Sequence, residues 1–298
     1  MISDQENFEI FNCDLCGSGD SVEAPHLREY TKDQPPPHIC KNCGLVYIKE
    51  RRSAQDIADI WSDELFETIY TARIPAMKAR HVYIAEFLDV NIGLKDKNVC
   101  DIGAGEGQFL EILKKYYGAN VFGIEPSKKN CQMLTNMDIP NFPGTIECYC
   151  NNPNAKNYQA DIVTIMWTLE NCRSCKDMLT AAHNILKPEG HVFVATGSRI
   201  LVPFKKPLHF YITNDPADSH AYRFSANTLR GALAISGFKT THINRYLDSD
   251  ILCILGQKQK PGAQIEWRKD NYQEVSDYFE RWHQDSKYFA HYDYHFIK

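Results

Sequence analysis

The sequence predicts an α/β fold in which a doubly wound, mostly parallel sheet is closed by an antiparallel hairpin and preceded by a small zinc-knuckle module. Short apolar runs alternate with helical stretches from residue 98 onward, and a glycine-rich turn follows the first run. Two C-x2-C pairs lie earlier in the chain. Strands separated by helices pair in parallel, because the crossover helix returns the chain to the same edge of the sheet. We divide the chain into a knuckle (1–53), a helical linker or cap (54–96), an α/β domain (97–259) and an aromatic-rich helical tail (260–298).

The composition is that of a folded protein with no general affinity for nucleic acid. The 298 residues are 43% hydrophobic and 12% aromatic, with a formal net charge of -5. This apolar content excludes a disordered chain, and the acidic balance argues against a nucleic-acid partner. Residues 1–6 lack the basic and then apolar pattern of a signal peptide, and no apolar run is long enough to span a membrane. We therefore expect a cytoplasmic protein with no membrane partner.

Two C-x2-C pairs, each followed directly by a glycine, are separated by 23 residues that include a run of three prolines. The proline-rich stretch predicts irregular chain between the pairs. Two such knuckles can converge four thiolates on one tetrahedral Zn²⁺, and glycine permits the tight turn after the second sulfur. Four unrelated buried thiols are the alternative, and His26 and His38 are expected to be surface histidines. The predicted ligands of this closed, structural zinc site are Cys13, Cys16, Cys40 and Cys43.

The elements after the knuckle follow from hydrophobic periodicity. Residues 54–89 predict two linker helices with a break near Pro75. Strands are predicted at 99–102, 120–124, 161–167 and 191–196, with helices at 107–117, 128–136 and 175–186. A helix at 225–236 is followed by two runs that predict the closing hairpin, 238–246 and 251–257. In the tail, apolar residues at helical spacing predict a docking face made by Tyr272, Val275, Tyr278, Phe279 and Trp282.

The glycine-rich turn at 101–107 carries the most information about function. It lies between a predicted strand and a predicted helix, and its first two glycines let the backbone approach a ligand. Gln108 stands where the dinucleotide fingerprint has its third glycine, which argues against a nicotinamide dehydrogenase. Asp101 can accept hydrogen bonds from an ammonium group, and Glu125, at the end of the next strand, can accept them from two ribose hydroxyls. This pattern favours a nucleoside that carries an amino acid.

With these motifs the sequence resembles the class I S-adenosylmethionine-dependent methyltransferases over about residues 56–257. Residues 160–167 are similar to the fourth strand of that family, and 186–193 to the turn before its fifth, with Glu189 in place of a glycine. The resemblance implies a Rossmann-like fold, S-adenosylmethionine as cofactor and adenine contacts near Ile146 and Glu147. The residues implied to bind the cofactor are Asp101, Gly103, Ala104, Gly105, Gly107, Glu125, Pro126, Trp167, Thr168 and Leu169, with Tyr70 and Arg73 on the linker helix. Arg73 or Arg80 would pair with the cofactor's carboxylate or be a solvated helix arginine.

The order of knuckle, helical linker and catalytic core resembles the zinc-knuckle methyltransferases of sugar and surface-polysaccharide biosynthesis, including nucleotide-sugar C-methyltransferases. This resemblance implies methyl transfer to a sugar, a sugar nucleotide or a related small polar metabolite. The C-methyltransferases carry a large additional C-terminal domain, whereas only the tail follows Gln257 here, and Asn171 replaces a histidine of many relatives. Methylation of another small natural product, RNA methylation, and a cofactor-binding scaffold without activity are the alternatives.

Methyl transfer requires an aligned acceptor and a group that removes its proton, and the pKa of histidine suits that task. His220 lies in the loop before a helix that, by the resemblance, overhangs the substrate pocket. His209 lies in the insertion after the fifth strand. Each is otherwise an ordinary loop histidine. A basic patch at Arg199, Lys205 and Lys206 would suit a diphosphate on the acceptor or be a solvated loop. The predicted catalytic residues are His220, His209 and Tyr222.

Overall fold

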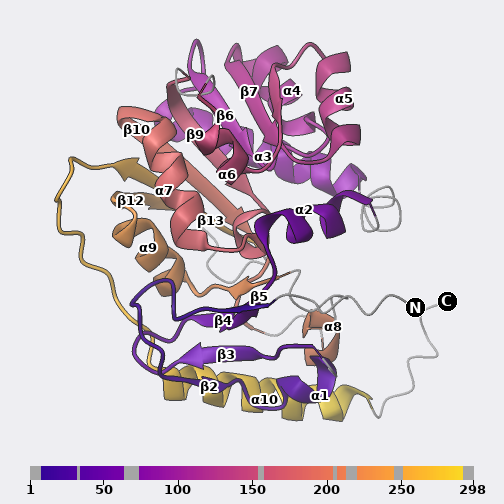
Figure 1. The fold of residues 1–298 in the computed structure, drawn as a ribbon, viewed down its shortest axis with the longest axis vertical. Helices are drawn as coiled ribbons and strands as arrows, with labels where there is room; N and C mark the ends of the chain where they lie inside the picture. The colour runs from indigo at the N-terminus through magenta and orange to yellow at the C-terminus, as the bar shows by residue number, and fades with distance from the viewer. Residues whose placement is uncertain are drawn as a thin grey trace.

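The computed structural model describes residues 8–31, 34–63, 74–153, 158–203, 207–212, 220–244 and 251–290. Within these ranges the chain forms a large sheet with helices on both faces and, beside it, a smaller sheet backed by the C-terminal helix (Figure 1). The helix α2 (Ala54–Asp63) lies between the two parts. The predicted α/β fold with an N-terminal cysteine cluster is confirmed.

The large sheet has the strand order β12-β13-β10-β9-β6-β7-β8. Its parallel strands around the centre are β6 (Asn98–Ile102), β7 (Asn120–Glu125), β8 (Asn141–Pro143), β9 (Ala160–Met166) and β10 (Leu186–Thr196). The strand β13 (Leu252–Lys258) runs antiparallel to both β10 and β12 (Phe238–Ile243). This pairing confirms the predicted closing hairpin, and the segment that connects its two strands, 245–250, lies outside the described residues.

Helices cover both faces of the large sheet, as a doubly wound fold requires. One face carries α3 (Ile74–Ile92), α4 (Gln108–Tyr117) and α5 (Lys128–Asn136). The other carries α6 (Ile146–Asn151), α7 (Cys175–Ile185) and α9 (Ala226–Ile235). Several of these helices begin at a hydroxyl side chain that accepts a hydrogen bond from a backbone N–H of the first turn, which fixes where the helix starts. These caps are Ser127, Thr145, Ser174 and Ser225.

The smaller sheet is formed mainly by the chain around the cysteine pairs, and its strand order is β11-β4-β3-β2. Its strands are β2 (Ser21–Glu23), β3 (Pro37–Cys40), β4 (Val46–Ile48) and β11 (Tyr222–Arg223), and α1 (Leu27–Thr31) lies between β2 and β3. A separate pair joins β1 (Glu9–Ile10) to β5 (Glu50–Arg51). The prediction of irregular chain between the cysteine pairs is therefore wrong where β2, α1 and β3 form. The strand β11 comes from far along the chain and pairs with β4.

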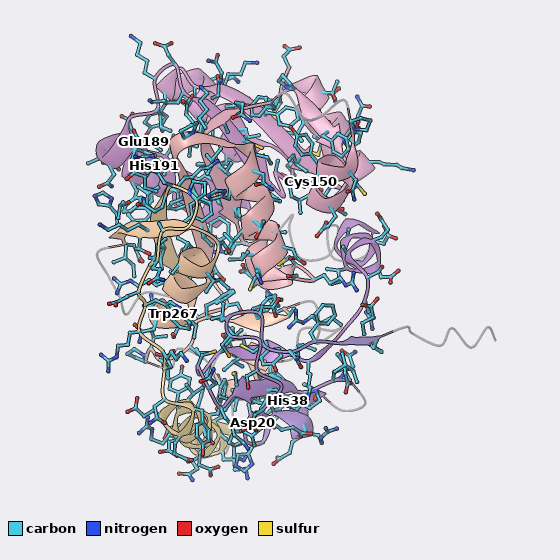
Figure 2. All side chains as sticks on the ribbon, turned by 60° about the vertical axis from the view of Figure 1, so that its left-hand side comes forward. Asp20, His38, Cys150, Glu189, His191 and Trp267 are labelled. Carbon is cyan, nitrogen blue, oxygen red and sulfur yellow. The ribbon has the colours of Figure 1, made fainter. Side chains whose placement is uncertain are left out.

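The C-terminal helix α10 (Tyr272–Ala290) packs beneath the smaller sheet together with α8 (Leu208–Ile212), as Figure 1 shows. The aromatic stripe of α10 is buried in one cluster with apolar side chains of α1, β3, β4 and α8, which confirms the predicted docking face. Trp267, on the segment that descends to α10, packs against α9, and its ring would lie 2.5 Å from a Cβ at Gly231 (Figure 2). The division of the chain into four parts remains our proposal. In this division the knuckle (1–53) and the tail (260–298) share the apolar cluster around α10. No helix in the described part of the chain is both long enough and apolar enough to cross a membrane.

Glu189 adopts a left-handed conformation, with φ 61°, at an irregularity of β10 between Leu186 and His191. Its side chain is exposed at the end of the molecule away from Asp20 and His38 (Figure 2). Because this conformation is strained in residues other than glycine, we expect Glu189→Gly to raise the free energy of unfolding by about 1 kcal/mol. Urea denaturation measures this change. Glu189→Ala is the control, because it removes the carboxylate and keeps the strain. Equal midpoints for the glycine and alanine variants would contradict the assignment of strain.

Candidate active site

A pocket lies at the carboxyl ends of β6, β7 and β9, where ligands bind in open α/β sheets. Its wall is formed by the turn after β6, the end of β7, the start of α6 and the segment after β9, while α2 and α3 supply further side chains. Ile146 and Glu147, where the resemblance implies adenine contacts, lie in this wall. The segment after β9 contributes Trp167 and Thr168, and, past a short 3-10 turn, η3 (Leu169–Asn171), it contributes Cys172 and Arg173.

The three glycines of the turn after β6 have different neighbours. All three are left-handed, with φ of 77° at Gly103, 54° at Gly105 and 80° at Gly107. A Cβ would lie 2.3 Å from Thr168 Oγ1 at Gly103 and 2.4 Å from Leu134 Cδ2 at Gly107, so packing within the protein requires those two glycines. At Gly105 no atom lies within 4 Å of such a Cβ. The backbone of Gly105 therefore faces space that a ligand can fill.

Glu125 is buried at the end of β7 with both carboxylate oxygens held in place. The N–H groups of Gly105 and Ser127 donate to it at 2.7 and 2.9 Å, and Asn130 Nδ2 donates at 3.3 Å. Burial raises the pKa of Glu125, and these three hydrogen bonds oppose the rise. The carboxylate is thus oriented beside the glycine turn, where it can accept hydrogen bonds from vicinal hydroxyls.

Asp101 lies in the floor of the same pocket and is 1% exposed. Thr164 Oγ1 donates a hydrogen bond to its Oδ1 at 2.7 Å. Burial raises the pKa of Asp101 to about 8, against the effect of the Thr164 hydrogen bond and with a contribution from the charge of Glu125. No lysine, arginine or histidine of the described residues forms an ion pair with it. A ligand ammonium group would supply the missing cation.

Aromatic and basic groups meet at the end of the pocket beside the segment after β9. The ring of Trp167 lies 6.0 Å from that of His81 and 5.9 Å from the guanidinium carbon of Arg80, while Phe109 lies 5.7 Å from His81. Burial, together with the charge of Arg80, lowers the pKa of His81 to about 4. Its Nδ1 has no hydrogen-bond partner in the part of the chain that the structure describes. The pocket thus contains a neutral imidazole.

The pocket brings together most of the residues predicted to bind the cofactor: Asp101, Gly103, Ala104, Gly105, Gly107, Glu125, Pro126, Trp167 and Thr168. Leu169 does not line the pocket, because it is the first residue of η3 and its side chain is buried in the core. Tyr70 and Arg73 lie outside the described residues. His81 was missed by sequence analysis, and the one signal was its place on a predicted linker helix, next to Arg80.

The three predicted catalytic residues do not line this pocket. Pairing of β11 with β4 places Tyr222 in the core, where its hydroxyl accepts a hydrogen bond from the N–H of Cys175 at 3.1 Å. His209 lies on α8, 6.2 Å from the ring of Tyr30. The carbonyl of His220 accepts a hydrogen bond from Arg223 Nη1 at 3.0 Å. In the predicted basic patch, Arg199 is buried, and Lys205 and Lys206 lie outside the described residues.

The four predicted zinc ligands converge, with their sulfur atoms all within 4.8 Å of one another. The Sγ–Sγ distance is 3.5 Å both between Cys13 and Cys43 and between Cys16 and Cys40. A tetrahedral Zn²⁺ with Zn–S bonds of about 2.3 Å separates its sulfurs by about 3.8 Å, which fits this arrangement. The glycine after each pair is left-handed and donates its N–H to the carbonyl of the first cysteine of that pair at 2.8 Å. The cluster packs against the start of α7, outside the pocket.

A second group with possible metal ligands, His26, Glu29 and His283, is explained without a metal. The two ring nitrogens of His26 pair with Glu29 at 3.0 Å and with Glu280 at 2.7 Å, and its ring stacks on that of His283 at 3.7 Å. Burial lowers the pKa of His26, but the two carboxylates outweigh it and the net pKa is raised. Protonated His26 donates hydrogen bonds from both ring nitrogens and links α1 to α10. His26 is half-buried and paired, and is not the free surface histidine that the sequence predicted.

Residues 77–243 match a protein family described as a methyltransferase domain. The chain belongs to this family. It is 29% identical over 157 residues to a ubiquinone biosynthesis O-methyltransferase of Vibrio atlanticus, covering 50% of this chain and 62% of that enzyme. The corresponding enzyme of Vibrio parahaemolyticus is 32% identical over 123 residues, with 39% and 49% covered. The matched region thus spans less than two thirds of these curated relatives.

Solved structures of methyltransferases share the fold. Magnesium protoporphyrin IX methyltransferase of Synechocystis with bound S-adenosylhomocysteine superposes with a TM-score of 0.52 at 12% identity, covering 70% of this chain and 100% of that one. A methyltransferase of Thermotoga maritima superposes with a TM-score of 0.50 at 20% identity, covering 68% and 100%. At these identities the likeness concerns the fold, and it confirms the Rossmann-like methyltransferase architecture.

The raised pKa of Asp101 makes cofactor affinity depend on pH in this methyltransferase domain. Below pH 8 the free pocket holds Asp101 protonated, and a ligand ammonium favours the carboxylate, so binding releases a proton. We expect the affinity for S-adenosylhomocysteine to rise by up to about tenfold per pH unit from pH 6 towards pH 8 and then to level off. Calorimetric titration in two buffers of different ionisation enthalpy measures both the affinity and the released proton. In Asp101→Asn the dependence should flatten, and a pH-independent wild-type affinity would contradict the assignment.

Proposed function

We propose that the protein is a methyltransferase that uses S-adenosylmethionine to methylate a hydroxyl oxygen of a small polar metabolite in the cytoplasm. The oxygen assignment is supported by the names of the curated relatives, which are O-methyltransferases, and the neutral imidazole of His81 in the wall of the pocket supplies a group that can take the hydroxyl proton. An oxygen acceptor needs a base as it attacks, and a neutral histidine is the most common protein base near neutral pH.

The described residues fit the cofactor group by group. Glu125 has the orientation to accept hydrogen bonds from both ribose hydroxyls, and Asp101 is a buried carboxylate without a cation. The open space at Gly105 allows close approach of a ligand to the backbone. S-Adenosylmethionine supplies an electrophilic methyl group on a positively charged sulfur. The chain's own residues bind and orient it through side chains on the ends of three rigid strands.

The proposed role of His81 is to accept the proton of the acceptor hydroxyl. As the acceptor oxygen bonded to the methyl carbon, the carbon–sulfur bond would break and S-adenosylhomocysteine would leave. The hydroxyl proton would pass to a ring nitrogen of His81 and later to solvent. Burial keeps the imidazole unprotonated before reaction, and Arg80 contributes because a second positive charge beside it is unfavourable. Phe109 and Trp167 flank His81 and limit the access of water to it.

A sugar or sugar nucleotide is the first acceptor class that we propose. The support is the succession of cysteine knuckle, helical linker and methyltransferase core, together with the ring of Trp167, which lines the pocket, because aromatic rings stack on the C–H face of sugars. The curated relatives are named ubiquinone biosynthesis O-methyltransferases, which favours a phenolic acceptor as the second candidate. Both classes present a hydroxyl oxygen to His81.

Transfer from S-adenosylmethionine carrying a ¹³C-methyl group tests this proposal. The purified protein is incubated with separate sets of nucleotide sugars, free sugars, phenols and RNA, and the products are examined by NMR. A new O-methyl signal in a sugar or phenol set is the expected result, and the set that gives it identifies the acceptor class. Methylation confined to nitrogen, carbon or RNA would overturn the oxygen assignment. Failure of wild-type protein to bind S-adenosylhomocysteine at millimolar concentration would support an inactive scaffold instead.

A further inference from the structure

Arg51 joins three segments that are distant in the sequence. Its guanidinium is 1% exposed and donates from Nη2 to Asp14 Oδ2 at 2.8 Å and from Nη1 to the carbonyl oxygen of Arg173 at 2.7 Å. Nη1 also contacts the hydroxyl of Tyr222, and Nε donates to the carbonyl of Ile48 at 2.7 Å. Each of the three guanidinium nitrogens is therefore engaged.

The acidic end of this connection lies inside the cysteine knuckle. Asp14 is located between Cys13 and Cys16, and its side chain is 5% exposed. A buried guanidinium is stable only when a carboxylate or several acceptors compensate its charge, so the position of Asp14 constrains that of Arg51. The conformation of the knuckle loop, which four bound sulfurs would fix, thereby determines where the guanidinium lies.

The other end of the connection is the wall of the cofactor pocket. Arg173 and Cys172 line that pocket, and the carbonyl of Arg173 accepts hydrogen bonds both from Arg51 and from the hydroxyl of Tyr222, the latter at 3.2 Å. Two residues earlier, Asn171 Nδ2 donates to the carbonyl of Trp167 at 2.8 Å. The wall from Trp167 to Arg173 is thus held at its end by Arg51 of the N-terminal module and by Tyr222 of β11, the strand that pairs with β4 of that module.

We propose that Arg51 is a positioning residue through which the metal-bound knuckle fixes the 171–173 wall of the pocket, so that cofactor affinity depends on a knuckle that lies outside the pocket. The inference rests on the proposed function for the identity of the ligand, but the connection from Asp14 to Arg173 does not. Arg51 itself touches neither the pocket nor the cysteine sulfurs. It acts by holding a backbone carbonyl that would otherwise be buried with one hydrogen bond fewer.

The test uses the full chain in three variants. Asp14→Asn weakens the link on the knuckle side while Arg51 keeps its bond to Arg173. Arg51→Met removes all the donors at similar volume, and Arg51→Lys retains the charge without the fork. Arg28→Met is the matched control, because Arg28 is an exposed arginine of the same module that pairs with Glu23. The readouts are metal content, hydrogen exchange of peptides covering 168–175, and calorimetric affinity for S-adenosylhomocysteine.

We expect Asp14→Asn and Arg51→Met to keep the metal, to speed exchange in 168–175 and to weaken S-adenosylhomocysteine binding by about tenfold, with Arg51→Lys intermediate and Arg28→Met unchanged. Unchanged exchange and affinity in folded Asp14→Asn and Arg51→Lys would overturn the proposal, even if Arg51→Met failed to fold. Weakened binding that always accompanied metal loss would also overturn it. If wild type bound no S-adenosylhomocysteine, the proposed function would fail, and the exchange data alone would still decide whether the link exists.

Discussion

Replacing Cys40 with serine is expected to abolish metal binding and to lower the free energy of unfolding by about 5 kcal/mol or more, because a structural Zn²⁺ contributes its binding energy to folding. Cys40 and Cys43 are fully buried and share one core cluster with Tyr222 and with apolar side chains of α7. Loss of the metal would therefore disturb the packing between the two sheets as well as the knuckle itself. Metal content measured by mass spectrometry and guanidinium denaturation of the variant give the result.

Cys148→Ser is the matched control for this prediction. Cys148 is a free, exposed cysteine on α6, far from the other four in sequence. Its replacement should leave both metal content and stability unchanged. Wild-type protein that is isolated without metal under mild conditions, with the same denaturation midpoint as Cys40→Ser, would show that the four thiols do not hold a structural ion.

Replacing His81 with glutamine should lower kcat by about 100-fold or more while affinity for S-adenosylhomocysteine changes little, because a general base contributes to the chemical step rather than to cofactor binding. The pKa of His81 is lowered to about 4, so the imidazole is neutral at pH 7 and stays so as the pH falls to 5. The acid limb of the kcat profile should therefore lie near pH 4 rather than near 6.5. Initial rates from pH 4 to 8 measure this limb.

A histidine remote from the pocket provides the comparison for His81. His191 lies in β10 next to Glu189, at the end of the molecule away from the smaller sheet (Figure 2), and His191→Gln should retain wild-type kcat. A His81→Gln variant with unchanged kcat and pH profile would exclude His81 as the base.

Local chemistry explains which parts of this site the sequence could predict. The cysteine pairs and the glycine turn impose their geometry over a few residues, and the left-handed glycines after each cysteine pair, Gly17 and Gly44, follow from the tight turn expected there. Glu125 follows from its place at the end of a predicted strand. The strand β8 was not predicted, because three residues are too few to show an alternation of apolar and polar side chains and one of them is Pro143.

Tertiary pairing explains what the sequence could not predict. The resemblance implied that the helix after His220 and Tyr222 overhangs the substrate pocket, but β11 pairs with β4 and places Tyr222 in the core beside the cysteine module. His81 could not be singled out, because nothing in the periodicity of α3 says which of its polar residues faces the glycine turn. Its position depends on how α3 packs on α4, which is a property of the assembled core.

The pairing of β11 with β4 also has a consequence for how the chain is made. The cysteine pairs leave the ribosome long before residues 222–223, which complete the smaller sheet, and before α10, which covers one face of that sheet. Contacts between segments so far apart in sequence form slowly, because a long loop must close before they are gained. During synthesis the apolar surface of the knuckle therefore stays uncovered until α10 has been made. We expect nascent chains that stop before α10 to bind chaperones or aggregate rather than to accumulate as a free N-terminal domain.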